Sequence, residues 1–213
     1  MPAWRWRLAQ AAEIRWWRRY LRGRDRDAYA GWKRGYWRTL LDELRLSPKP
    51  GSRVLDAGCG PAGIFTALPH CEVVAVDPLL PRYEGLEHFV RGDYPHVRFV
   101  ADELERFAPE RDFDYVFCLN VVNHVRDLAR VFAVLAQAAR PGAPVVVSVD
   151  AHRHVWLKPI FRAVPGDILH PHQYDLEEYV RLAEASGLDV IARRRYRREA
   201  LFDYWVLTCA APT

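Results

Sequence analysis

The chain has 213 residues, of which half are hydrophobic and 27% are charged, a composition typical of one globular unit with a sizeable core. No apolar run approaches the roughly 20 residues needed to span a bilayer, and the N-terminus has no apolar signal segment. The four cysteines are scattered without a C-x-x-C pair, so we expect reduced thiols and a cytoplasmic protein rather than disulfides or a zinc site.

The first 40 residues are basic and aromatic, whereas the rest of the chain is mildly acidic. They contain 11 of the lysines and arginines, 3 acidic residues and six of the eight tryptophans. Apolar residues recur there at a spacing of three to four, which predicts two helices separated near Gly23, with Asp25 or Asp27 capping the second. The predicted apolar faces are Trp4, Leu8, Ala11, Ile14, Trp17 and Leu21 in the first helix, and Tyr29, Trp32, Tyr36 and Leu40 in the second.

A linker follows these helices, because Pro48, Pro50 and Gly51 cannot continue a helix. It divides the chain into an N-terminal helical extension, residues 1–46, and a main domain, residues 47–213. Within the main domain strands and helices alternate. The strands are expected at 53–57, 72–76, 97–101, 113–118 and 144–150, and the helices at 62–69, 81–91, 125–139 and 175–186.

The strands are almost continuous apolar runs, as in parallel sheets that helices cover on both faces. Two further strands, 190–192 and 202–207, have no room for a crossover helix between them and should pair antiparallel. The pattern therefore predicts a doubly wound α/β fold with a mostly parallel sheet that ends in an antiparallel hairpin.

The most informative segment is 54–63, where an apolar strand ends in Asp56 and leads into Gly58, Gly60 and Gly63. Glycine allows a tight turn and close approach of a ligand to the backbone, and a following helix would point free N–H groups at that ligand. This arrangement predicts a nucleotide-type ligand. The acid that ends the second strand, Asp77, could accept hydrogen bonds from both hydroxyls of a ribose.

Two ligands fit this pattern, a nicotinamide dinucleotide and S-adenosylmethionine, and Asp56 favours the second. A pyrophosphate over the turn would meet the Asp56 carboxylate at close range, whereas an ammonium and a sulfonium would be attracted to it. The alternative is that Asp56 only caps the following turn.

Four stretches together resemble the class I S-adenosylmethionine-dependent methyltransferases, above all the small-molecule group. They are 54–63 (VLDAGCGPAG), 73–77 (VVAVD), 113–127 (FDYVFCLNVVNHVRD) and 139–143 (ARPGA). The resemblance covers residues 46–213 and implies a seven-stranded sheet with a terminal antiparallel hairpin. It also implies that extra N-terminal helices often cover the cofactor pocket.

The resemblance assigns roles residue by residue. Asp56, Gly58 and Gly60 would line the methionine end of S-adenosylmethionine, Asp77 would hold the ribose, and Asp102 or Glu103 would contact the adenine amine. The complete set of expected cofactor-binding residues is Asp56, Gly58, Cys59, Gly60, Asp77, Pro78, Asp102, Glu103 and Asn120.

The acceptor side offers three catalytic candidates, His124, His152 and Tyr174, on loops at the carboxyl ends of strands. Histidine is easily poised as a base near neutral pH, although His124 could instead cap the next helix. Two H-x-H pairs, His152 with His154 and His170 with His172, raise the question of a metal. No carboxylate or cysteine cluster joins them, so no metal is expected.

We therefore expect a methyltransferase that acts on a small-molecule acceptor, which the sequence does not name. The alternatives are an NAD-dependent oxidoreductase and a non-catalytic binding protein on the same fold. The N-terminal helices could form a lid, could simply pack on the sheet domain, or could present a basic surface to nucleic acid or anionic lipid. No nucleic-acid motif accompanies them, so nucleic acid is not the expected partner, and nothing indicates the oligomeric state.

Overall fold

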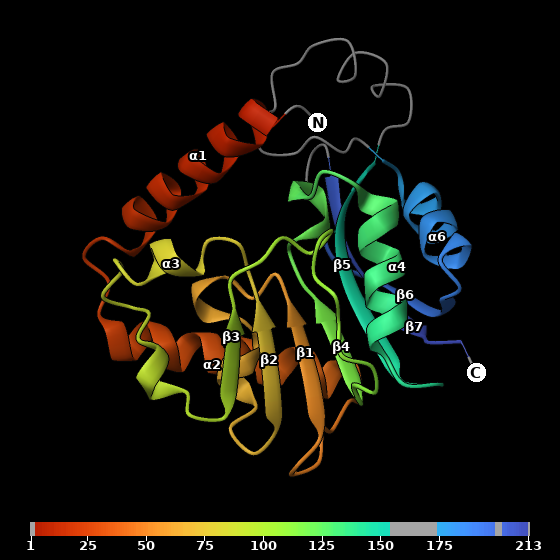
Figure 1. Ribbon diagram of the computed structural model, residues 1–213, viewed down its shortest axis with the longest axis horizontal. Coiled ribbons are helices and arrows are strands. Elements are labelled where there is room, and N and C mark those ends of the chain that lie inside the picture. The colour runs from red at the N-terminus through yellow and green to blue at the C-terminus, as the bar shows by residue number, and fades with distance from the viewer. Residues whose placement is uncertain (1–2, 154–173, 199–201, 213) are drawn as a thin grey trace.

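The computed structural model describes residues 3–153, 174–198 and 202–212 and has a seven-stranded sheet at its centre (Figure 1). The strands are β1 (Arg53–Ala57), β2 (Glu72–Val76), β3 (Val97–Val100), β4 (Tyr115–Cys118), β5 (Pro144–His152), β6 (Asp189–Arg198) and β7 (Phe202–Ala210).

The strand order is β3-β2-β1-β4-β5-β7-β6. Strands β1 to β5 pair in parallel, and β7 lies antiparallel between β5 and β6. The predicted doubly wound sheet with a terminal antiparallel hairpin is confirmed. The order reverses between β1 and β4, so the loops after β1, β2 and β4 meet at the edge where open α/β sheets bind ligands.

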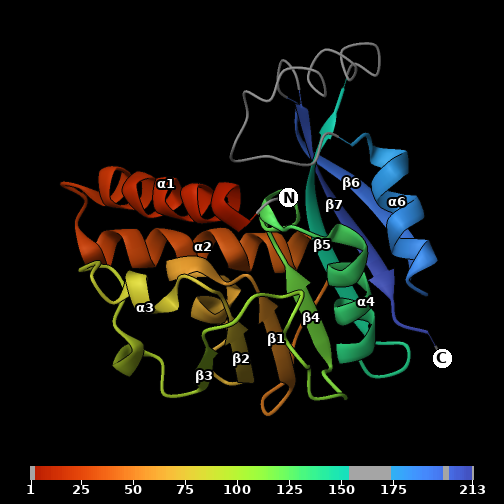
Figure 2. The same cartoon turned by 45° about the horizontal axis from the view of Figure 1, so that its top comes forward.

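Helices cover both faces of the sheet, as Figures 1 and 2 show. The α-helices are α1 (Ala3–Leu21), α2 (Arg26–Glu43), α3 (Leu80–Tyr83), α4 (Leu128–Ala138) and α6 (Leu176–Ala185). Short 3₁₀ turns are η1 (Gly60–Ala62), η2 (Ile64–Ala67), η3 (Arg91–Asp93) and η4 (Val122–His124). None of these described helices is long and apolar enough to cross a bilayer.

The sheet separates two apolar cores, because successive side chains of a strand point to opposite faces. In β1, Leu55 packs into the core with α4 and α6, and its neighbour Val54 packs into the core with α1 and α2. In β5, Val145 and Val146 divide in the same way. Both faces of these strands are buried, which explains their continuous apolar sequences.

The two predicted N-terminal helices are present, and both contribute buried residues to the apolar core on one face of the sheet. The side chain of Asp25 caps α2 by accepting a hydrogen bond from the N–H of Ala28 (2.8 Å). Helix α2 buries Tyr29, Trp37, Leu40 and Leu41, and α1 lies over it with Ile14 and Leu21 buried (Figure 2).

Four members of the expected apolar faces of these helices, Leu8, Ala11, Trp32 and Tyr36, are exposed. Leu8 is 52% exposed, Trp32 is 55% exposed and Tyr36 is 37% exposed. Trp37, which was not on the expected face, is buried instead.

The helices expected at 62–69 and 81–91 were wrong. The first is replaced by η1 and η2, because Gly63 adopts an extended conformation between them (φ −72°, ψ −174°). Of the second, only residues 81–83 are α-helical, as the end of α3, and Arg91 begins the 3₁₀ turn η3. The segment that follows is irregular, and Leu86 and Phe89 are buried in it. Their apolar character therefore reflects burial and not a helix.

Candidate functional site

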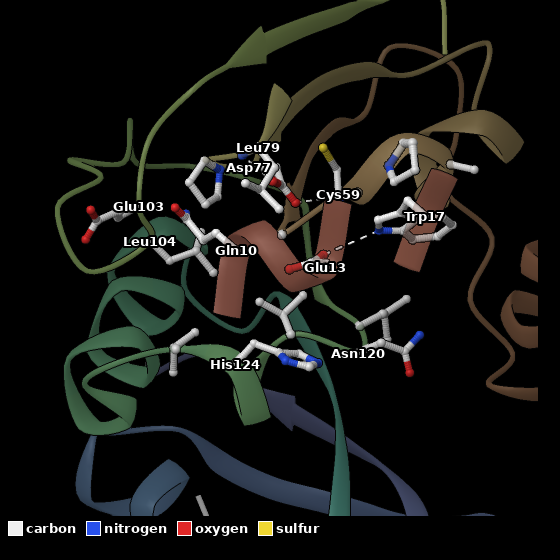
Figure 3. A pocket seen from close by; sticks show the side chains of 18 of the residues that line it. Gln10, Glu13, Trp17, Cys59, Asp77, Leu79, Glu103, Leu104, Asn120 and His124 are labelled. Atoms are coloured by element: carbon white, nitrogen blue, oxygen red, sulfur yellow. Dashed lines mark hydrogen bonds between the residues drawn. The ribbon is translucent and has the colours of Figure 1, made fainter. Parts of the chain in front are cut away.

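A cavity lies at the carboxyl ends of β1, β2 and β4 and is covered by α1 (Figure 3). Its floor comes from the loops after these strands, and its cover comes from Gln10, Glu13 and Trp17 of α1 and from Lys33 and Trp37 of α2. Eight of the residues predicted from the sequence line it: Gly58, Cys59, Gly60, Asp77, Pro78, Glu103, Asn120 and His124.

The backbone of the floor has little freedom. Gly58 has a φ of +78°, and a Cβ added to it would lie 2.2 Å from Cγ2 of Val121, so only glycine fits. Asn120 also has a positive φ, +61°, a conformation that asparagine tolerates better than most residues. Its N–H donates to Oγ of Ser148 (2.6 Å), which ties the loop after β4 to β5.

Asp77 is the central acid of the floor. One carboxylate oxygen accepts from the N–H of Gly60 (3.0 Å), and the other accepts from the N–H of Leu79 (2.8 Å). Burial, followed by the nearby charge of Glu13, raises the pKa of Asp77 to about 7. Asp77 is thus fixed by the backbone of the glycine turn while it borders the cavity.

Asp56 does not line the cavity. Its carboxylate turns into the bend after β1 and accepts from the N–H of Phe65 (3.1 Å). A Cβ on Gly63 would lie 2.3 Å from Oδ2 of Asp56, so the third glycine of the turn makes room for this carboxylate. Burial raises the pKa of Asp56 to about 7. The capping role considered for Asp56 is therefore present in the structure.

The N–H groups of this turn are largely used inside the protein. Those of Gly58 and Cys59 donate to the carbonyl of Val76 (2.7 and 3.1 Å), and that of Gly60 donates to Asp77. Since no α-helix follows the turn, the expected row of free helix N–H groups is absent from this described segment. The turn offers little that would hold a phosphate.

Helix α1 contributes a further acid to the cavity, the partly buried Glu13. Its Oε1 accepts from Nε1 of Trp17 (3.4 Å) and from the hydroxyl of Tyr83 (3.2 Å). Burial raises the pKa of Glu13. Figure 3 shows Glu13 projecting from α1 into the pocket that Asp77, Asn120 and His124 also line.

Helix α2 is anchored on the glycine turn by Trp37, whose Nε1 donates to the carbonyl of Ala62 (2.9 Å). Lys33 lies one helical turn earlier, with its Nζ 4.5 Å from the centroid of the Trp37 ring. Burial lowers the pKa of Lys33 to about 8, and the charge of Asp56 opposes that shift.

The lining is predominantly acidic, with Glu13, Asp77, Glu103 and Glu105 against one lysine. Such a cavity attracts a cationic ligand and repels a diphosphate, because charges in a partly buried cleft are poorly screened. The electrostatic argument first made for Asp56, which does not line the cavity, therefore rests on these four acids instead.

The other predicted site residues lie elsewhere. Asp102 accepts from the N–H of Glu103 (2.8 Å), and only Glu103 of this pair reaches the cavity. His152 is buried at the end of β5, its ring 4.5 Å from that of Phe202. Tyr174 borders a neighbouring hollow that shares Glu103 with the cavity. His154, His170 and His172 lie outside the described residues, in which no cluster suited to a metal ion is present.

Sequence reasoning missed Glu13 and Lys33, although both stand out in retrospect. Glu13 is the only acidic residue among the first 24, and Lys33 is the only lysine among the first 40. No motif surrounds either of them. The only signal in the sequence is that each is a rare residue type in its segment.

The cavity measures about 170 Å³ in this structure. Pockets for drug-sized ligands usually have a volume of roughly 300–1,000 Å³. Gln10, Glu13 and Trp17 enter the space from α1, so an outward shift of α1 is the simplest way to enlarge it.

Comparison with known proteins places the chain in a family. A family described as "Methyltransferase domain" matches residues 29–193, from within α2 to β6. Among curated proteins, the ubiquinone biosynthesis O-methyltransferase of Hahella chejuensis is 41% identical over 107 residues, which cover 46% of this chain and 43% of that protein. The protein of the same name from Rhizobium rhizogenes is 30% identical over 181 residues, covering 78% of this chain and 72% of that protein.

The first curated relatives are longer proteins, of which this chain spans about half (43% and 57%). Among solved structures, the N-methyltransferase NodS of Bradyrhizobium japonicum in complex with S-adenosylhomocysteine has a TM-score of 0.63 and 18% identity. The alignment covers 91% of each chain. At this identity the likeness establishes the fold.

Proposed function

The chain belongs to the methyltransferase domain family, and we propose that it transfers the methyl group of S-adenosylmethionine to a small-molecule acceptor. The observation that carries this proposal is the acidic cavity over the glycine turn, with Asp77 held at its floor by two backbone N–H groups. A nicotinamide dinucleotide is disfavoured, because its diphosphate would face Glu13, Asp77, Glu103 and Glu105.

The donor groups of the cavity suit an adenosyl sulfonium compound. Asp77 has the acceptor capacity to take hydrogen bonds from ribose hydroxyls, and its bond from Gly60 fixes the carboxylate in place. Gly58 has no side chain to fill the space beside Val121. Glu103 borders the cavity and is the acid that would accept from an adenine amine.

When bound, S-adenosylmethionine supplies an electrophilic methyl group on a positively charged sulfur. The protein's own contribution is to position the acceptor in line with that group and to exclude water, an effect worth up to roughly 7–11 kcal/mol in favourable cases. His124 lines the cavity and is the candidate to take a proton from the acceptor. Helix α1 moves outward to admit the ligand and then closes over it, which excludes water from the transfer.

The acceptor is a small molecule in this proposal, and its reacting atom is oxygen or nitrogen. Curated relatives are named O-methyltransferases, and one similar structure is that of an N-methyltransferase. A panel of phenols and primary amines therefore covers both possibilities in a first activity screen with radiolabelled S-adenosylmethionine.

Thermal unfolding with S-adenosylmethionine, S-adenosylhomocysteine and NAD tests the proposal directly. Both adenosyl compounds should raise Tm in a concentration-dependent way, and NAD should not. Stabilisation by NAD together with no effect of either adenosyl compound would contradict the proposal. Binding of the adenosyl compounds without methyl transfer to any acceptor would favour a non-catalytic binding protein.

A further inference from the structure

The outer surface of α1 and α2 carries large apolar side chains that take no part in the cavity. Six such side chains are exposed among the described residues, and four of them lie on these two helices: Leu8, Trp16, Trp32 and Tyr36. Trp16 is 51% exposed and Trp32 is 55% exposed. Neither ring lines the cavity, so the chemistry of the cavity does not account for them. Two exposed indoles on neighbouring helices indicate a surface that binds something.

The exposed rings belong to one continuous strip that crosses from α1 to α2, the helix that lies beneath it in Figure 2. Trp16 stacks on Tyr20 of the same helix, with ring centroids 4.8 Å apart and 9° between the ring planes. The ring of Tyr20 contacts that of Tyr29 in α2 at 6.2 Å, and Tyr29 contacts Trp32 at 5.8 Å. Tyr36 follows Trp32 at 6.2 Å. These five residues are called the aromatic strip.

Arginines without an acidic partner lie beside the aromatic strip. Five arginines in α1 and directly after it are exposed: Arg15, Arg18, Arg19, Arg22 and Arg24. None of the ion pairs found among the described residues includes one of them. The guanidinium of Arg24 lies 4.3 Å from the centroid of the Tyr20 ring, and Arg19 follows Trp16 by three residues on the same face of the helix. The single acid of α1, Glu13, borders the cavity instead.

Exposed indoles together with unpaired arginines fit the surface of an anionic lipid bilayer. Lipid phosphates attract arginine, and tryptophan prefers the boundary between headgroups and acyl chains, where its ring is removed from water and its N–H keeps a polar partner. The exposed Leu8 of α1 adds an aliphatic group that suits the same boundary.

Two other occupants fit less well. A nucleic acid also attracts arginines, but base stacking requires open ring faces, and Tyr20 already covers one face of Trp16. A second copy of the chain would bring the same arginines to the contact, where like charges repel.

We propose that the aromatic strip and the arginines of α1 bind the surface of an anionic lipid bilayer. The arginines contact lipid phosphates, while Trp16 and Trp32 enter the headgroup region. The cavity lies on the other side of α1, where Glu13 borders it, so the bilayer and a ligand occupy different surfaces of this helix. The inference goes beyond the proposed function and does not depend on it, because no step uses a methyl donor.

Co-sedimentation of the full chain with lipid vesicles tests this inference. One set of vesicles contains phosphatidylcholine alone, and the other contains equal parts of phosphatidylcholine and phosphatidylglycerol. The protein should bind the anionic vesicles at least about tenfold more tightly than the neutral ones, because several arginines act together. Binding to the anionic vesicles should weaken as the salt concentration rises, since salt screens exposed charges.

Substitutions in the strip and beside it assign the binding to this surface. The double variant Arg15→Gln, Arg19→Gln should weaken binding to anionic vesicles by roughly 25-fold, because one arginine near such a surface contributes about 1 kcal/mol, or about fivefold. Trp16→Ala should weaken it by about 5- to 20-fold, because an indole no longer enters the headgroup region.

The matched control removes two positive charges elsewhere on the surface. Arg111 and Arg181 are exposed and lie outside α1 and α2. The double variant Arg111→Gln, Arg181→Gln should change vesicle affinity by less than about threefold. Thermal unfolding of every variant should remain within a few degrees of the unmodified protein, because the replaced side chains are exposed.

A preference for anionic vesicles that falls in the helix variants and persists in the control supports the inference. Equal binding to neutral vesicles, or equal losses in the helix variants and the control, overturns it. The absence of vesicle binding also overturns it. In that case, retention of a single-stranded RNA oligonucleotide by the same residues would identify a nucleic acid as the occupant. A dimer in sedimentation velocity that Trp16→Ala dissociates would identify a second copy of the chain.

Discussion

The cavity has two walls that are built by different means. The sheet wall contains Gly58, Asp77 and Asn120. Hydrogen bonds from backbone N–H groups hold it, and Gly58 and Asn120 adopt positive φ angles that few other residue types tolerate. The helical wall, with Glu13 and Lys33, consists of side chains that α1 and α2 extend over the site. The comparison teaches that the backbone fixes the sheet wall, which makes it predictable from sequence. The helical wall depends on the position of α1 and α2 and can change when these helices move.

The largest expected effect falls on the sheet wall. Asp77→Ala should weaken binding of S-adenosylhomocysteine by at least about 100-fold, because two charge-assisted hydrogen bonds are lost and the N–H of Gly60 loses its acceptor. Titration calorimetry measures the change, with Asp93→Ala as the control, since Asp93 is an exposed acid paired with Arg26. Unchanged affinity in Asp77→Ala would refute the assignment of the sheet wall.

Removal of α1 tests whether the helical wall acts as a cover. A chain starting at residue 25 keeps α2, whose buried Trp37, Leu40 and Leu41 rule out a longer deletion. We expect kcat/KM to fall by roughly 10- to 100-fold, because water is no longer excluded, while Tm falls by only a few degrees.

The matched control for this deletion is Arg18→Gln, on the exposed side of α1. It should leave both kinetics and stability close to those of the full chain. Identical kinetics with and without α1 would mean that the helix only packs on the domain and that the cover has no role in turnover.

Trp37→Phe separates anchoring of the helical wall from ligand contact. The substitution leaves the carbonyl of Ala62 without its donor and should cost about 1–3 kcal/mol of unfolding free energy. Denaturant unfolding measures the loss. Trp32→Phe, at a site that is 55% exposed, should change stability by less than about 0.5 kcal/mol. Equal effects at the two positions would show that the indole–carbonyl bond does not hold α2.

A pH dependence of stability is expected from acids of both walls. The pKa of Asp77 rises from its ordinary 3.8 to about 7 on folding, and that of Glu13 also rises. Between pH 4 and 7 the folded protein therefore holds protons that the unfolded chain has released, and unfolding free energy should fall as pH rises. Asp77→Asn should flatten this decline in urea titrations. Parallel curves for the two proteins would show that Asp77 does not contribute.

Much of the sheet wall could be predicted from sequence, because it depends on short-range rules. The apolar runs of β1 and β2 predicted the first and last residue of each strand correctly. Gly58, Asp77 and Asn120 lie in the loops that follow strands, as the motifs indicated, and all three line the cavity. The helix expected after the turn was wrong, because the carboxylate of Asp56 takes the N–H of Phe65 and Gly63 interrupts the winding.

The helical wall could not be predicted in the same way. Glu13 and Lys33 meet the cavity only because α1 and α2 fold back over the sheet, which depends on the packing of Ile14, Leu21 and Trp37. Sequence spacing indicates which residues share a helix face, but it does not indicate which face meets a distant loop. For this reason the expected apolar face of α2 included Trp32, which is exposed, and omitted Trp37, which is buried.

The position of α1 over the cavity has a consequence for the rate at which ligands exchange. Gln10, Glu13 and Trp17 of α1 border the cavity, so a ligand that passes on this side has to displace the helix. Under the proposed function, release of the demethylated product on this side would loosen the apolar contacts of Ile14 and Leu21, and the strength of that packing would contribute to the residence time of the product. A smaller side chain at either position would shorten this residence time and, where release limits turnover, speed the enzyme.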